Sequence, residues 1–128
     1  MITDYIEEVK AKLITSKIIR SFSVITEQIL EDQGYFGARL WLINGDFLEV
    51  AEYFKVINGK LITDRYRYQW MDKSQRDLRK RWDNVPHFPN LPNFPHHIHV
   101  KAEENVQASN VLSIMQVLAL VEDEFPSE

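Results

Sequence analysis

The sequence predicts an α+β fold, in which an antiparallel meander sheet of about five to six strands is covered on one face by an N-terminal and a C-terminal helix. Apolar residues recur at helical spacing near both ends of the chain. Between them, Asn44-Gly45 and Asn58-Gly59 each separate two alternating runs, as the tight turn of a β-hairpin requires. A chain of 128 residues that is 45% hydrophobic is the right size for a single domain over 1–128.

The expected elements follow in order along the chain. The first is an amphipathic helix, because apolar residues recur every three or four positions with charged residues between them, at Ile2, Tyr5, Ile6, Val9 and Leu13. A strand-forming run rich in Ile, Val, Phe and Ser follows at 17–30. Further strands are expected at 36–43, 46–57, 60–70, 76–83 and 96–101, and a closing helix at about 105–124.

The Asn-Gly pairs also predict which residues share a face of the sheet, because a two-residue loop fixes the strand register. With such loops, Glu52 opposes Gly37 on one side and Arg65 on the other. One face is then charged and holds Arg39, Glu52, Arg65, Arg67 and Gln69. The other is apolar, is expected to lie under the helices, and holds Phe36, Ala38, Leu40, Leu42, Phe47, Ala51, Tyr53, Ile62, Tyr66, Tyr68 and Trp70.

The composition excludes several classes of protein. The chain has no cysteine, which rules out disulfides and thiolate metal sites and favours a reducing cytoplasm. Its N-terminus does not resemble a signal peptide, and the longest apolar stretch, at 111–121, is shorter than the roughly 20 residues that cross a membrane. The net charge of −4 argues against a globally basic nucleic-acid binder. Between Lys60 and Arg81, however, eight basic residues against three acidic ones form a local surface suited to phosphate.

Glu52 is a candidate general base on the predicted charged face. Gly37 beside it leaves space, and Arg65 supplies a countercharge. For an isolated pair, a cross-strand salt bridge worth about 0.2–1 kcal/mol is the better explanation. Arg39 and Arg67 share the predicted face, however, and three guanidiniums around one carboxylate exceed what pairing requires. The surplus indicates an anionic ligand, because a guanidinium binds phosphate with two hydrogen bonds.

All four histidines lie in one segment, Arg81–His99. Prolines at every third position, 86, 89, 92 and 95, predict an extended, polyproline-like loop. On a strand that follows it, His97 and His99 share one face while His96 takes the other. An imidazole can give or take a proton near neutral pH. For any single histidine, a hydrogen bond to the loop or the backbone is the better explanation, but four in one short segment favour a functional role.

A metal site is the alternative interpretation of the same segment. His-x-His on a strand can place two imidazoles on one ion, with His87, Asp83 or Glu52 as further ligands. The spacing matches no fixed zinc pattern. We therefore expect no metal and no other cofactor, and keep the metal-dependent site as the less favoured alternative.

The predicted closing helix is apolar on more than one side. One stripe holds Val111, Leu112, Met115, Leu118, Ala119 and Glu122, and the opposite side holds Ile114, Val117, Leu120 and Val121. One sheet face cannot cover both sides. Deep burial and an interface, either a homodimer or a contact with a partner protein, explain this pattern equally well.

Four motifs in order resemble the TumE family of toxins from prokaryotic toxin–antitoxin systems. They are Glu52-Tyr53, RYRYQW at 65–70, RWDNVPH at 81–87 and FPHHIH at 94–99, and the resemblance covers about Phe36 to His99. It implies an antitoxin encoded nearby, usually of helix-turn-helix type, and the prokaryotic cytoplasm. The motif residues that it carries over are Glu52, Tyr53, Arg65, Tyr68, Arg81, Asp83, Asn84, His87, His96, His97 and His99.

The leading hypothesis from the sequence is therefore a toxin that acts on RNA without a metal. One of His87, His96, His97 and His99 acts with Glu52 as acid and base. Phosphate is held by Arg39, Arg65, Arg67 and Arg81, and supporting roles fall to Tyr53, Tyr68, Asp83 and Asn84. The alternatives are a non-catalytic module that binds nucleic acid or a protein partner, and a metal-dependent hydrolase built on the histidines.

Overall fold

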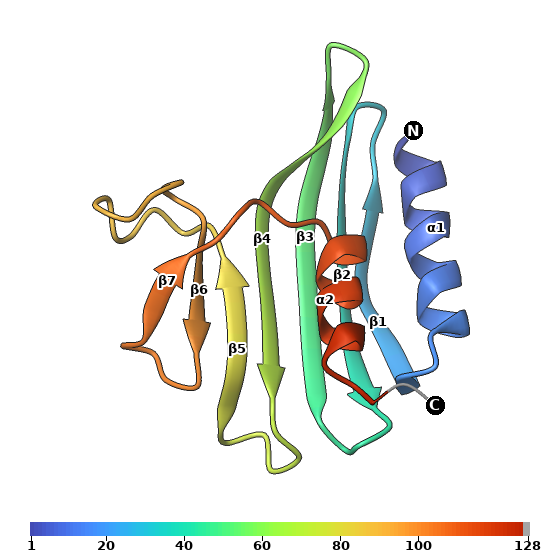
Figure 1. The fold of residues 1–128 in the computed structure, drawn as a ribbon. Helices are drawn as coiled ribbons and strands as arrows, with labels where there is room; N and C mark the ends of the chain where they lie inside the picture. The colour runs from blue at the N-terminus through green and yellow to red at the C-terminus, as the bar shows by residue number, and fades with distance from the viewer. Residues whose placement is uncertain (127–128) are drawn as a thin grey trace.

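The computed structural model describes residues 1–126. Two helices flank seven strands, in the order α1 (Ile2–Thr15), β1 (Ile19–Ile29), β2 (Gln33–Leu42), β3 (Phe47–Ile57), β4 (Lys60–Met71), β5 (Leu78–Asp83), β6 (His97–Val100), β7 (Val106–Ala108) and α2 (Ile114–Asp123). The strands form one sheet in sequence order, and each is antiparallel to the next (Figure 1). The predicted α+β meander is confirmed, with seven strands in place of five or six.

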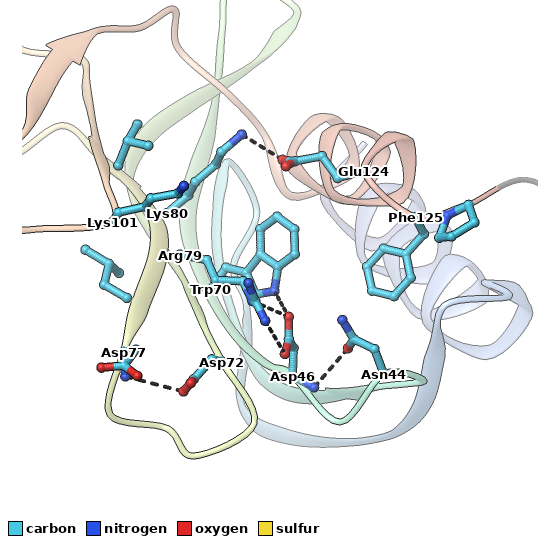
Figure 2. Close-up of a pocket in the computed structure, with 13 residues that line it drawn as sticks. Asn44, Asp46, Trp70, Asp72, Asp77, Arg79, Lys80, Lys101, Glu124 and Phe125 are labelled. Carbon is cyan, nitrogen blue, oxygen red and sulfur yellow. Dashed lines mark hydrogen bonds and ion pairs between the residues drawn. The ribbon is translucent and has the colours of Figure 1, made fainter.

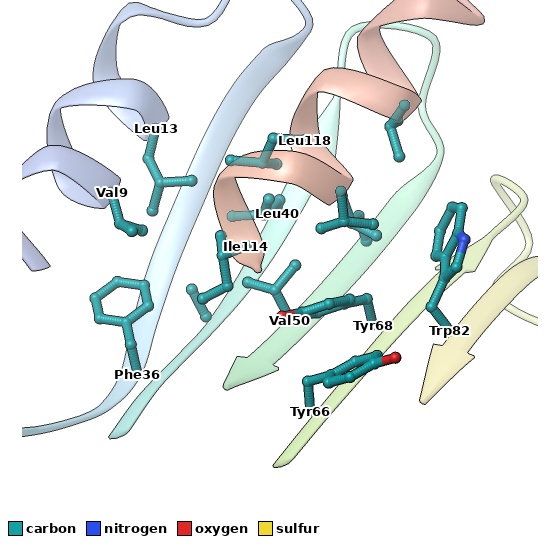
Figure 3. Packing of buried hydrophobic residues seen from close by; sticks show 14 of the residues in the cluster. Val9, Leu13, Phe36, Leu40, Val50, Tyr66, Tyr68, Trp82, Ile114 and Leu118 are labelled. Carbon is teal, nitrogen blue, oxygen red and sulfur yellow. The ribbon is translucent and has the colours of Figure 1, made fainter. Parts of the chain in front are cut away.

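Both helices cover one face of the sheet, on the side of β1 to β4 (Figure 1). In α1, the residues that contact the sheet recur every three or four positions, and Ile2, Ile6, Val9 and Leu13 are buried as predicted. Figure 3 shows Val9 and Leu13 beside apolar side chains of the sheet and of α2. The end of the sheet formed by β5, β6 and β7 lies away from both helices (Figure 1).

The closing helix begins later than predicted. It starts at Ile114, because Ser113 caps it: the Ser113 hydroxyl accepts from the Gln116 backbone, and the Gln116 side chain accepts from the Ser113 backbone. Residues expected to be helical from 105 onward instead form β7 and an extended crossing, because Val106 pairs with His99 in the sheet. The apolar residues predicted for this helix therefore differ in burial. Ile114, Val117, Leu118 and Val121 are buried, whereas Val111 and Leu120 are exposed.

The predicted register of the first hairpin is wrong by one residue. Its loop has three residues, because the Leu42 amide donates to the carbonyl of Asp46 across positions 43–45. Gly45 adopts a left-handed conformation with φ 91°, as the last residue of such a loop does. Phe36 therefore opposes Glu52, and Gly37 opposes Ala51.

The second hairpin has the predicted two-residue loop, with positive φ at both Asn58 and Gly59. The register nevertheless shifts further along, where β3 and β4 form a β-bulge between Phe54 paired with Thr63 and Tyr53 paired with Arg65. Asp64 is the extra residue of the bulge. Beyond it, Glu52 opposes Tyr66 rather than Arg65.

These two shifts correct the predicted faces. The expected core side chains of β2 and of the C-terminal half of β4 are buried, as predicted (Phe36, Ala38, Leu40, Leu42, Tyr66, Tyr68 and Trp70). On β3 the prediction is wrong, because Leu48, Val50, Glu52 and Phe54 are the buried residues. Tyr53 and Ile62, expected in the core, are exposed. Figure 3 shows Val50 beside Tyr68 under α2.

Glu52 consequently lies on the helix-covered face, opposite to Arg65 and Arg67, and is only 1% exposed. Its Oε1 accepts from the Tyr5 hydroxyl at 2.5 Å and from the Ile114 amide at 3.0 Å, and its Oε2 accepts from the Thr63 hydroxyl at 2.6 Å. The carboxylate therefore ties α1, β4 and the N-terminus of α2 together, where a negative charge is also favoured by the helix dipole. Burial raises the pKa of Glu52, although these hydrogen bonds act in the opposite direction.

The raised pKa of Glu52 predicts how its variants respond to pH. A folded-state pKa above the unfolded value makes the folded protein bind more protons, so this group lowers the free energy of unfolding as pH rises above about 4.5, up to the folded pKa. Glu52→Gln removes this dependence and can keep all three hydrogen bonds, since a hydroxyl can accept from its amide. We expect the Gln variant to be at least as stable as the wild type at pH 7, with the difference shrinking toward acid.

Glu52→Ala is the matched variant that leaves the three donors without an acceptor. It should lower the free energy of unfolding by about 2–4 kcal/mol, with the larger loss toward pH 4.5, because the contribution of Glu52 to wild-type stability falls as pH rises. Urea unfolding of the three proteins between pH 4.5 and 8 measures both effects. An alanine variant as stable as the wild type would show that the carboxylate does not hold the helices.

Candidate functional site

The face of the sheet that carries no helix presents two rows of polar side chains. One row runs across the sheet through Arg67, Asp83 and His97, which are paired residues of β4, β5 and β6. The next runs through Gln69, Arg81 and His99. Tyr68, Trp82 and Ile98 lie between these rows along the strands and point to the other face, where Tyr68 and Trp82 belong to the core. The alternation of the strands therefore places these polar groups on the face opposite to the helices.

Asp83 is the centre of a buried cluster in these rows. Its Oδ1 lies 3.0 Å from Nε2 of His97, and its Oδ2 lies 3.8 Å from Nε2 of His99. Asp83, His97 and His99 are each less than 5% exposed. The Val85 amide donates to Oδ1 at 3.1 Å, and Arg81 Nε approaches Oδ2 at 3.4 Å. These three residues are the one set of metal-ligating side chains that converges within residues 1–126.

Both imidazoles are oriented by backbone carbonyls. Nδ1 of His97 lies 2.9 Å from the carbonyl oxygen of Pro95, and Nδ1 of His99 lies 2.7 Å from that of Glu103. A carbonyl oxygen only accepts, so each Nδ1 carries a proton and donates. The predicted backbone hydrogen bond is thus present, but it leaves both Nε2 atoms turned toward Asp83.

A hollow of about 310 Å³ opens beside the cluster, and Arg67, His87 and Glu103 help to line it. Phe88 covers part of the cluster, with its ring centre 5.2 Å from that of His97 and 6.0 Å from that of His99 in edge-on contact. Phe88 has φ 62°, an uncommon conformation for a bulky residue. Such strain persists where surrounding contacts hold it, and it is common at functional sites.

The arginines of this face differ in their partners. Arg81 forms a bidentate ion pair with Glu103, which raises the pKa of Arg81 and lowers that of Glu103. Arg39 pairs with Glu49 at 3.1 Å. Arg67 donates to the neutral Gln69 side chain at 2.7 Å, and within residues 1–126 it forms no ion pair. Arg67 therefore lies at the edge of the hollow without a direct ion-pair partner among the described residues, within electrostatic range of Glu103.

The remaining predicted site residues lie apart from this cluster. Arg65 lies over the Tyr53 ring at 4.3 Å, on the open face. Tyr68 is buried under the crossing to α2, and its hydroxyl donates to the Leu112 carbonyl at 2.8 Å. His96 points to the helix side as predicted, where Nδ1 lies 2.9 Å from the Tyr66 hydroxyl and burial lowers its pKa.

The prediction that the proline segment is an extended arm reaching Glu52 is wrong. The segment 84–96 contains turns, with backbone hydrogen bonds from Leu91 to Phe88 and from His96 to Asn93. After this segment, β6 pairs with β5, which places His97 and His99 beside Asp83. Glu52 lies on the opposite face of the sheet. The prediction of one site containing Glu52 and the histidine pair is therefore corrected.

Asn84, the last residue of the RWDN motif, holds the bulged part of β4. Its Nδ2 donates to the Asp64 carbonyl at 2.8 Å, and its Oδ1 accepts from the Tyr66 amide at 3.1 Å. The side chain thus makes the hydrogen bonds to β4 that a neighbouring strand would make, at the point where β5 has ended. Asn84 fixes the start of the loop that follows Asp83.

Glu103 and Phe88 are the residues that sequence reasoning missed. Glu103 reaches Arg81 through the turn between β6 and β7, and the predicted helix at 105–124 hid this hairpin. An expected strand at 106–108 would have placed Glu103 beside His99. The contact of Phe88 with the histidines could not be predicted from residue spacing, because the position of Phe88 depends on the turns of the loop.

A second hollow, of about 650 Å³, lies at the other end of β4 and β5 (Figure 2). Its buried carboxylate and several of its other charged groups have partners. Asp46, 1% exposed, accepts from Trp70 Nε1 at 3.0 Å and from Arg79 at 3.2 Å. Lys80 pairs with Glu124 at 2.7 Å (Figure 2). These contacts join the first hairpin to β4, β5 and the end of α2, which gives this region a structural role.

A family model described as Toxin TumE matches residues 9–127. The chain belongs to the TumE toxin family. Membership of this toxin family implies a partner antitoxin. Searches of curated proteins and of solved structures found no match. Among the described residues of this TumE family member, no helix is both long enough and apolar enough to cross a membrane.

The two hydrogen bonds of Asn84 predict a loss of stability in Asn84→Ala. Removing the half-buried amide leaves the Asp64 carbonyl and the Tyr66 amide without partners, so we expect the free energy of unfolding to fall by about 1–3 kcal/mol. The Tyr66 amide should also exchange its hydrogen faster. Urea unfolding and hydrogen exchange measure these effects.

Asn105→Ala is the matched control, because Asn105 donates a similar side-chain hydrogen bond to Val100 from an exposed turn. This variant should lower the free energy of unfolding by less than about 0.5 kcal/mol. Equal losses in both variants would contradict the special role of Asn84 at the bulge.

Proposed function

We propose that this TumE family member acts on RNA and cleaves its phosphodiester backbone at the cluster of Asp83, His97 and His99. One observation supports this proposal above the others. A buried pair of imidazoles with a carboxylate opens into the same hollow as Arg67, a guanidinium without an ion-pair partner in residues 1–126. Groups that move protons thus lie next to a group that holds phosphate.

The proposed reaction is attack by the RNA 2′-hydroxyl on the adjacent phosphorus. The bond from the 2′-oxygen to phosphorus forms, the bond from phosphorus to the 5′-oxygen breaks, and the proton lost from the 2′-hydroxyl is balanced by one gained at the leaving oxygen. His97 and His99 are proposed to assist this proton transfer through their Nε2 atoms. Charge on the phosphate oxygens is stabilised by Arg67, with Arg81 behind it.

In this proposal, Asp83 has the role that was predicted for Glu52. Glu52 is enclosed by α1, α2 and Thr63 on the other face, and its oxygens already accept three hydrogen bonds. Asp83 contacts both imidazoles, so it can orient them and stabilise their positive charge. Phe88 makes edge-on contact with both rings, so it narrows the access of RNA to them.

The TumE family context supports a toxin held inactive by an antitoxin. We propose a helix-turn-helix protein as that antitoxin, encoded beside the toxin. A neighbouring reading frame of this type that forms a complex with the chain and blocks RNA cleavage would support the proposal. A neighbour that does not bind the chain would contradict it.

Arg67→Ala tests the role of the hollow in RNA cleavage. Loss of one guanidinium–phosphate contact, about 1.5–3 kcal/mol, should lower kcat/KM for RNA by roughly 10- to 150-fold. Arg39→Ala is the matched control on the same face, because three strand spacings put it about 14 Å from Arg81. The control should change kcat/KM by less than about threefold.

Purified wild-type chain, incubated with single-stranded RNA and analysed by gel electrophoresis, decides between cleavage and binding alone. We expect cleavage that His97→Ala and His99→Ala abolish while circular dichroism stays that of a folded protein. RNA binding without any cleavage would favour the non-catalytic module instead. Equal losses in Arg67→Ala and Arg39→Ala would remove the hollow as the phosphate site.

A further inference from the structure

We infer that Asp83, His97 and His99 form a binding site for one divalent transition-metal ion. The three ligand atoms, two Nε2 atoms and a carboxylate oxygen, all lie within 4.8 Å of one another. An ion at about 2.0–2.2 Å from each donor holds its donors roughly 3.0–3.5 Å apart. The observed separations, 3.0 Å from His97 Nε2 to Oδ1 of Asp83 and 3.8 Å from His99 Nε2 to Oδ2, lie close to that range. A small closure of the cluster completes the site.

The proton positions point to a cation at the centre of this cluster. Each Nδ1 donates to a carbonyl, so in the neutral imidazole the Nε2 atom carries a lone pair. Both lone pairs therefore face the lone pairs of the Asp83 carboxylate in a buried place. Such an arrangement is repulsive unless a cation lies between the donors.

The geometry distinguishes a metal ion from a proton in this place. A proton can join Nε2 of His97 only to the carboxylate oxygen at 3.0 Å, whereas one divalent ion can accept lone pairs from both imidazoles and the carboxylate together.

The environment of the two histidines has the form of a metal site. Metal-ligating imidazoles donate their other N–H to a carbonyl or carboxylate, as His97 does to Pro95 and His99 does to Glu103. The donors come from paired positions of β5 and β6, which keeps them rigid. Two imidazoles and one carboxylate suit Zn²⁺, Mn²⁺ or Fe²⁺ and leave coordination positions open. The hollow beside Arg67 lies where a substrate oxygen could take one of them.

Metal binding does not depend on the proposed RNA cleavage, but it completes that proposal. A bound divalent ion lowers the pKa of a water ligand and polarises a phosphate oxygen. The resulting hydroxide can take the proton of the RNA 2′-hydroxyl and become water. The substrate would then meet a metal-bound base and the guanidinium of Arg67 in the same hollow.

The test is direct metal binding to the full-length chain, purified without a histidine tag and stripped with EDTA. Zn²⁺ titration by calorimetry should give one site per chain, and Co²⁺ should give visible absorption bands of a site with nitrogen and oxygen ligands. His97→Ala, His99→Ala and Asp83→Asn should each weaken binding by at least about 100-fold. Zn²⁺ should raise the melting temperature of the wild type but not of these variants.

His96→Ala is the matched control, because His96 lies in the same segment but points to the other face. It should bind Zn²⁺ as the wild type does. The inference is overturned if the stripped chain binds neither Zn²⁺, Mn²⁺ nor Co²⁺, or if His96→Ala loses as much affinity as His97→Ala. A ligand variant that is folded by circular dichroism and still binds with wild-type affinity also overturns it.

RNA assays on the same samples separate the two proposals. A chain that binds the metal but never cleaves RNA refutes the proposed function alone. A chain that cleaves RNA at full rate after EDTA treatment, and that binds no metal, refutes the metal site alone.

Discussion

The β-bulge at Asp64 is the constraint on which both faces of the sheet depend. One extra residue between Thr63 and Arg65 puts Tyr66, Tyr68 and Trp70 under the helices and leaves Arg65 and Arg67 on the open side. Without the bulge, the β4 arginines would point into the core. Asn84, the residue after Asp83, forms hydrogen bonds with the bulged backbone of β4. It thereby stabilises the register that places Arg67 beside Asp83. The fold and the site therefore share one irregularity.

Glu52 and Asp83 are buried carboxylates on opposite faces of the sheet, and their partners give them different roles. Glu52 faces hydroxyls and a backbone amide, which are neutral donors that satisfy it fully. Asp83 faces two imidazole nitrogens whose protons are directed elsewhere, together with Arg81. Complete satisfaction by neutral donors is suited to holding helices in place. A carboxylate whose neighbours include two imidazoles that can bind a cation is suited to chemistry.

The sequence predicted the elements better than their register. Helical spacing and strand propensity located α1 and most strands, and the loop at Asn58-Gly59 was predicted correctly, because these features depend on local residues. Asn44-Gly45 misled the prediction, since Asn-Gly also fits a three-residue loop, and a shift of one position exchanges the faces. The predicted helix at 105–124 hid β7, so the contact of Glu103 with Arg81 could not be foreseen.

The RWDN motif links core packing to site geometry within four residues. Trp82 is buried on the helix side, Arg81 and Asp83 point to the open side, and Asn84 bonds β4. On β6, Ile98 pairs with Trp82 and points to the helix side, so His97 and His99 on either side of it point to the open side. Because alternate residues of a strand are fixed to opposite faces, the pairing of β5 with β6 fixes the backbone positions of Asp83 and the two histidines. Only small side-chain movements are therefore needed when an ion or substrate binds.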